Sequence, residues 1–181
     1  NGDTATALAA MADVIANDTM PGAISAEDRL ATARSHINAG DKITAEKVLL
    51  GIRDSELQQM ALMEQASFAA LLAVSSVERG KIRFTGLRPA MLVTEFNSTT
   101  RLDIMRAALS LDDHQLADLQ SGQLMASPDA KKVFGAARTL YALHGREKDF
   151  REIQRQVALL RIKHEEEPPP DSQAAKTENP G

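Results

Sequence analysis

The sequence predicts an all-α protein, either an irregular helical bundle or a short stack of helical hairpins. Aromatic residues make up only 3% of its 181 residues, and its apolar residues are mainly Ala, Leu, Met and Ile. Because β-sheets favour aromatic and β-branched side chains, this composition favours helices. Residues typical of helix starts also alternate along the chain with glycines typical of helix ends.

Three start signals combine a capping side chain with acidic residues in the first helical turn. They are SAED at residues 25–28, SLDD at 110–113 and SPD at 127–129. The proline of the third suits the first helical position, so the serine of each stretch is expected to cap a helix. The glycines expected to end helices are Gly22, Gly40, Gly80, Gly122 and Gly145.

Residues 55–79 form the longest and least polar of the predicted helices. Alanines alternate there with larger apolar residues around most of the circumference. A helix that is apolar on several faces is typical of the middle of a bundle, so this segment is predicted to be the central helix. The complete set of predicted helices is 4–16, 26–39, 44–52, 55–79, 89–96, 99–109, 112–120, 128–144 and 147–166.

The stretch GKIRFTGLRP at residues 80–89 is predicted to be a loop, because two glycines and Pro89 interrupt the helical pattern. We expect one helical domain over residues 1–164, which this loop could subdivide. Residues 165–181 are rich in Pro and Glu and contain almost nothing to bury. They are predicted to be a disordered tail or a linker.

Residues 30–52, LATARSHINAGDKITAEKVLLGI, resemble one helix-turn-helix unit of the tetratricopeptide family. Ala33, Gly40, Ala45 and Leu49 stand where that family places small, glycine, small and large residues. The rest of the chain adds only a partial second copy, and stacked repeats need about three. A tetratricopeptide-like stack is therefore the less favoured of the two all-α arrangements.

No pattern in the sequence is typical of a catalytic or metal-binding site. The absence of cysteine excludes disulfides, thiolate ligands and cysteine nucleophiles. The four histidines lack the i, i+4 pairing of a zinc-binding helix, and no glycine-rich phosphate loop is present. We therefore predict no catalytic residues, no metal and no cofactor. A site assembled from distant residues leaves no linear pattern, so an enzyme stays open as the third alternative.

Positive charge gathers near the end of the chain. Residues 131–163 hold nine basic and three acidic residues, although the whole chain carries a formal charge of −4. On a helix over 147–166, one face carries a basic stripe, which consists of Lys148, Arg151 and Arg155. A neighbouring face carries an apolar seam, which consists of Phe150, Ile153, Val157 and Leu160.

A second basic cluster lies in and just before the predicted loop, where Arg79, Lys81, Arg83 and Arg88 surround Phe84. An exposed Phe84 ringed by cations would suit docking of a partner. A buried Phe84 that anchors the loop is the alternative, and it is the more common state of a phenylalanine.

These features predict a non-catalytic protein-interaction domain whose partner contacts lie on the basic stripe and on the loop at 79–88. The partner is another protein, acidic in character, or a second copy of the chain that associates through the seam. Nucleic-acid binding is the alternative, because phosphates would also suit the stripe. The negative net charge of the whole chain and its scarcity of aromatic residues disfavour nucleic-acid binding. No run of about 20 apolar residues could span a membrane, and the sequence does not assign a compartment.

Overall fold

A computed structural model describes residues 24–166, with side chains described as far as residue 163. Within that range every regular element is a helix, which confirms the all-α prediction. The predicted helix 4–16 and most of the predicted tail 165–181 lie outside the described residues. The helices are α2 (Ala26–Asn38), α3 (Lys42–Leu50), α4 (Asp54–Gln59), α5 (Leu62–Ser75), α6 (Val77–Val93), α7 (Ser98–Ser110), α8 (His114–Ala126), α9 (Ala130–Leu143) and α10 (Glu147–Glu166).

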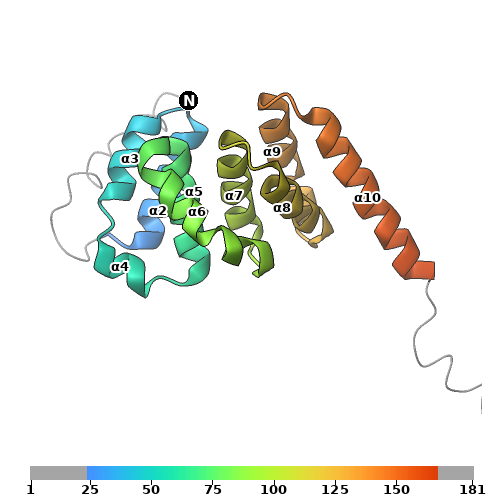
Figure 1. Ribbon diagram of the computed structural model, residues 1–181, viewed down its shortest axis with the longest axis horizontal. Coiled ribbons are helices and arrows are strands. Elements are labelled where there is room, and N and C mark those ends of the chain that lie inside the picture. Colours follow the sequence, from blue (N-terminus) through green and yellow to red (C-terminus); the bar gives the residue numbers. More distant parts are fainter. Residues whose placement is uncertain (1–23, 167–181) are drawn as a thin grey trace, which may run out of the picture.

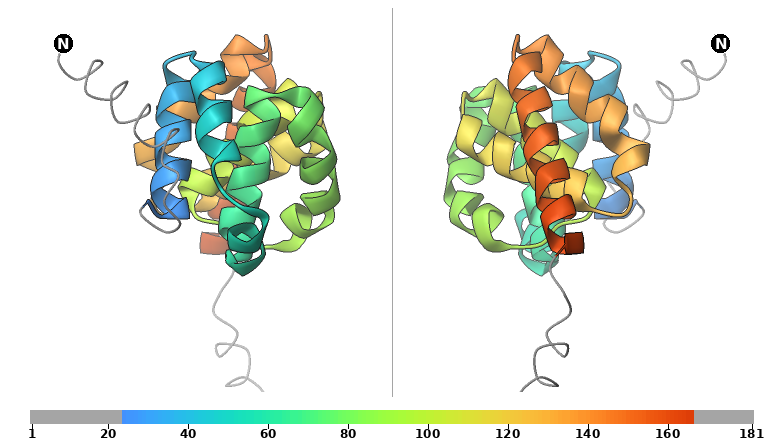
Figure 2. Two further views of the ribbon diagram at one scale, coloured as in Figure 1. Left: turned by 90° about the vertical axis from the view of Figure 1, so that its left-hand side faces the viewer. Right: turned by 90° about the vertical axis from the view of Figure 1, so that its right-hand side faces the viewer.

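The helices form an elongated bundle (Figure 1). The most extensive contacts join α5 with α6, α5 with α7, α2 with α3 and α7 with α8. Helix α5 lies in the middle and contacts α2, α3, α6 and α7. Helices α8, α9 and α10 form the other end, where α10 packs on both α8 and α9. The two end views of Figure 2 show the helices of each end crossing one another. None of the described helices is long and apolar enough to cross a membrane.

Helix α5 is the predicted central helix, but it is shorter than expected. The side chains from Ala66 to Val74 are all buried. The predicted helix 55–79 is wrong in its extent, because it is broken into α4, α5 and the start of α6. Met60 and Ser76 adopt extended backbone angles at the two breaks. The carboxylate of Glu64 accepts a hydrogen bond from the Ala61 N–H at 3.0 Å, which fixes the start of α5.

The predicted loop at residues 80–89 is wrong, since these residues lie inside α6. A Cβ atom on Gly80 would lie 2.1 Å from the backbone nitrogen of Ala73. This glycine therefore permits close contact between α5 and α6 instead of ending a helix. Gly80, Phe84 and Met91 are buried on the inner face of α6, and this tertiary burial outweighs the low helix propensity of glycine and proline.

The predicted caps are correct in one case of three. The Ser25 hydroxyl accepts a hydrogen bond from the Asp28 N–H at 3.1 Å and caps α2. Ser110 instead lies in the last turn of α7, and Asp113 caps α8 through the Leu116 N–H. Ser127 donates its hydroxyl to the Leu124 carbonyl at the end of α8. In both wrong cases α7 or α8 extends further than predicted, so the serine falls at the end of the preceding helix.

Candidate protein-binding surface

Helix α10 packs on the domain through the predicted apolar seam. Phe150 is 1% exposed, and its ring centroid lies 5.3 Å from that of Tyr141 and 5.2 Å from that of Phe134. Ile153 and Val157 are half-buried against the same core. Of the four seam residues, Leu160 alone is exposed, so the seam offers a second copy of the chain only a small part of its apolar surface.

A groove of about 740 Å³ runs between α8 and α10. Leu119 and Gly122 of α8 line one side, and Ile153 and Leu160 of α10 line the other. Helix α10 extends away from the other helices toward its C-terminal end (Figure 1). The second half of α10 is therefore covered less completely than the first.

The basic stripe lies on the solvent side of α10, and its arginines are paired within the helix. Arg151 donates to the Glu147 carboxylate at 3.1 Å, and Arg155 donates to Glu152 at 3.0 Å. Lys148 has no ion-pair partner among the described residues. Exposed pairs within one helix are screened by water and stabilise it only weakly. The arginines are therefore not held against the body of the domain and can exchange partners.

The same solvent face continues into two large apolar side chains that the sequence reasoning did not include. Leu159 is 55% exposed and Ile162 is 51% exposed. Leu159 lies one helical turn after Arg155, so charged residues cover the first half of this face and apolar residues the second. The signal was the run VALLRI at 157–162, which is apolar on nearly every side.

The basic cluster predicted around Phe84 lies on α6, far from α10, because α7 and α8 lie between them (Figure 1). Phe84 is 2% exposed, so its side chain is part of the core and not of the surface. Arg79 lies 3.3 Å from Glu46 and Arg83 lies 3.6 Å from Asp54, and both arginines are exposed. Lys81 is exposed and has no ion-pair partner in the described part of the chain.

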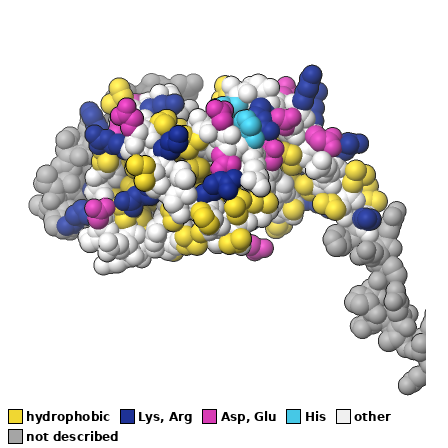
Figure 3. Space-filling model, in the orientation of Figure 1, with side chains coloured by type: hydrophobic (Ala, Val, Ile, Leu, Met, Phe, Trp, Pro, Cys, Tyr) yellow, Lys and Arg dark blue, Asp and Glu magenta, His cyan; other side chains and the backbone are white. Residues whose placement is uncertain are grey.

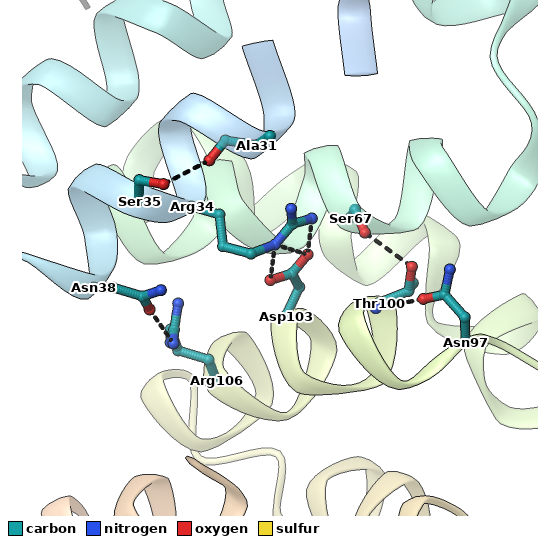
Figure 4. A network of polar contacts seen from close by, with 9 residues as sticks. All are labelled: Ala31, Arg34, Ser35, Asn38, Ser67, Asn97, Thr100, Asp103 and Arg106. Atoms are coloured by element: carbon teal, nitrogen blue, oxygen red, sulfur yellow. Dashed lines mark hydrogen bonds and ion pairs between the residues drawn. The ribbon is translucent and has the colours of Figure 1, made fainter. Parts of the chain in front are cut away.

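Buried polar side chains in the middle of the domain hold helices together. Asp103 of α7 is 1% exposed and accepts hydrogen bonds from Arg34 of α2 at 2.7–3.1 Å (Figure 4). Burial raises the pKa of the Asp103 carboxyl, and the Arg34 guanidinium opposes that rise. Next to this pair, Ser67 of α5 donates to Thr100 at 3.1 Å. These contacts fix the relative positions of α2, α5 and α7.

Arg146 plays the same structural role at the other end. Its guanidinium bonds to Asp118 at 3.2 Å and to Asp149 at 2.7 Å. The Tyr141 hydroxyl donates to Asp118 at 2.8 Å, and burial together with this carboxylate raises the pKa of the phenol. Asp118 belongs to α8 and Asp149 to α10, so the cluster secures the first turns of α10 on the domain.

The described residues include no group of three or more His, Asp or Glu side chains placed to hold a metal ion. The fold and surface define an all-helical domain with one helix whose outer face is half cationic and half apolar. Comparison of the chain with protein families, with curated protein sequences and with solved structures gave no match.

Proposed function

We propose that this protein acts by binding another protein through the solvent face of α10. The face consists of Lys148, Arg151 and Arg155 in its first half and of Leu159 and Ile162 in its second. Its partner is a segment that carries acidic side chains beside apolar ones. The observation that supports this proposal is the exposure of Leu159 and Ile162 at the end of a cationic stripe.

Energetics favour a protein partner for this face. Large apolar side chains exposed as a contiguous group are typical of interaction sites. Burying them would add about 25 cal/mol for each Å² removed from water. The neighbouring arginines would add bidentate hydrogen bonds to carboxylates, which fix orientation and select an acidic partner.

Two features of the structure disfavour the nucleic-acid alternative. Helix α10 contains five basic and five acidic residues, so its net charge is zero. The phenylalanines and the tyrosine in the described range are buried or half-buried. Bases would therefore find no exposed aromatic ring on which to stack. An acidic protein segment remains the better match for a face that is half apolar.

The test is a quantitative affinity capture from the organism's own extract with variants of the full chain. Arg151→Glu with Arg155→Glu removes the cationic half, and Leu159→Ser with Ile162→Ser removes the apolar half. Lys42→Glu with Lys47→Glu makes the same charge change on exposed positions of α3 and serves as the matched control. All of these side chains are exposed, so the variants should unfold at nearly the wild-type temperature.

We expect one or more proteins to be recovered by the wild type and by the α3 control and to be lost by both α10 variants. Equal recovery by all forms would exclude the α10 face as the binding surface. Loss with the charge reversal alone, together with sensitivity to nuclease, would replace this proposal with nucleic-acid binding.

A further inference from the structure

Helix α6 carries an apolar ridge on its solvent side, and α7 and α8 lie between this helix and α10 (Figure 1). Ile82 is 82% exposed and Val93 is 84% exposed, which makes them the two most exposed large hydrophobic residues of the described chain. Gly86 and Pro89 are also exposed and lie between them. The four follow one another at gaps of four, three and four residues, so they lie on one side of the helix.

The ridge lies on the side of α6 opposite to its buried inner face. Gly80, Phe84 and Met91 are buried against the domain, whereas the ridge residues face away from it. A Cβ atom on Gly86 would meet nothing within 4 Å. The middle of the ridge is thus a shallow, unobstructed position where a large side chain of another helix could insert, as a knob enters a hole in a coiled coil.

Cationic side chains flank the ridge on both sides. At 100° per residue, Arg79 and Arg83 lie on one flank of Ile82 and Lys81 lies on the other. Helix α6 contains four basic residues and one acidic residue. Of the four, Arg88 is held by Asp113 at 2.5 and 3.0 Å. Arg79 and Arg83 form ion pairs at 3.3 and 3.6 Å, and the Arg83 guanidinium also lies 5.4 Å from the ring centroid of Phe68. Both arginine side chains are still exposed, and Lys81 has no ion-pair partner among the described residues. Figure 3 shows hydrophobic and Lys or Arg side chains interspersed on the face along which α6 runs.

We propose that the α6 ridge binds an amphipathic helix of another protein that has an apolar seam and acidic residues on both flanks. The ridge supplies the heptad-like spacing that such a helix requires, and Arg79, Lys81 and Arg83 supply the opposite charges. This site does not depend on the function proposed for α10, because the two surfaces share no residue.

A defined probe tests this inference. The probe is a synthetic helical peptide about three heptads long, with Leu at the a and d positions and Glu at e and g. Charge repulsion between the glutamates keeps it from pairing with itself. A second peptide with Lys in place of Glu is the matched control. Binding to the full ¹⁵N-labelled chain is followed by backbone amide shifts and by fluorescence anisotropy.

We expect the Glu peptide to shift amides along α6 and to bind at least about tenfold more tightly than the Lys peptide. Ile82→Ser with Val93→Ser should abolish binding, whereas Ile43→Ser with Leu143→Ser, at other strongly exposed positions, should leave it unchanged. Arg79→Glu with Lys81→Glu should reverse the preference to the Lys peptide.

Equal affinity for the two peptides would overturn the inference, as would the absence of shifts on α6. Shifts confined to α10 would also overturn it while supporting the function proposed for that helix. Binding that appears only after removal of residues 1–23 would show that the chain's own N-terminal segment is the occupant, and the inference would then be wrong.

Discussion

Arg34 and Asp103 form an ion pair between α2 and α7, two helices that both pack on α5. The Arg34 Nε lies 2.9 Å from Oδ1 of Asp103, and its Nη2 lies 2.7 Å from Oδ2. The carboxylate has almost no contact with solvent. The pair therefore fixes how α2 and α7 are placed relative to each other, and its loss should weaken the fold without touching either proposed surface.

Replacing one partner of this pair should destabilise the protein strongly. Arg34→Met leaves a buried carboxylate without its cation, and we expect a loss of about 3–5 kcal/mol in the free energy of unfolding. The double variant Arg34→Met with Asp103→Leu removes both charges and should be less destabilised than Arg34→Met alone. Urea denaturation at neutral pH measures both values. A loss below about 1 kcal/mol for Arg34→Met would show that the pair is solvated and of little consequence.

Gly80→Ala should destabilise the protein because the new Cβ would lie 2.1 Å from the backbone nitrogen of Ala73. Backbone atoms cannot move aside as a flexible side chain can, so we expect a loss of at least about 1–3 kcal/mol. Gly86→Ala in the same helix is the matched control, since its Cβ would meet open space. That control should gain up to about 1 kcal/mol from helix propensity. The thermal unfolding midpoints of the two variants test this difference in stability. Equal midpoints would contradict the close contact between α5 and α6.

The protein should become less stable at acidic pH, and protonation of the Asp113 carboxylate should contribute to this loss. Hydrogen bonds from Arg88 lower the pKa of this carboxyl below its usual value. The folded pKa lies below the unfolded one, so the stabilisation is complete above the unfolded pKa and is lost as the pH falls through the folded pKa. We expect the urea midpoint to decrease between about pH 5 and pH 3.

Asp113→Asn identifies this contribution, because the amide oxygen can still cap α8 but carries no charge. The variant should have a shallower decrease of the urea midpoint over the same pH range, and it should be less stable than the wild type at neutral pH. Identical pH profiles for the two proteins would show that Arg88 does not shift the Asp113 titration.

Two positions of the apolar seam should respond very differently to alanine. Phe150 is buried between Phe134 and Tyr141, so Phe150→Ala should cost about 3–5 kcal/mol. Leu160→Ala, at an exposed position of the same seam, should cost less than about 0.5 kcal/mol. Chemical denaturation measures the free energy of unfolding of each variant. A large loss for Leu160→Ala, combined with a concentration-dependent midpoint, would instead indicate that the seam is buried against a second copy.

The sequence by itself determined the helical class, the existence of most helices and the two faces of α10. Those features depend on local propensity and on the period of apolar residues, and both can be read from neighbouring positions. The pattern of Phe150, Ile153 and Val157 placed the seam correctly. The excess of basic residues beside it located a surface whose charges the structure shows to be exposed.

The tertiary structure alone decided the remaining features. Gly80 and Pro89 are local signals for a loop, yet packing of Phe84 and Met91 against the domain keeps them within a helix. That packing buries Phe84, which was the favoured of its two predicted states, and leaves Ile82 and Val93 exposed on the other side of α6. The partners of Asp103 and Arg146 also come from distant segments. Such contacts depend on which helices pack together. The period of apolar residues predicts which face of a helix is buried, but it does not predict which other helix packs on that face.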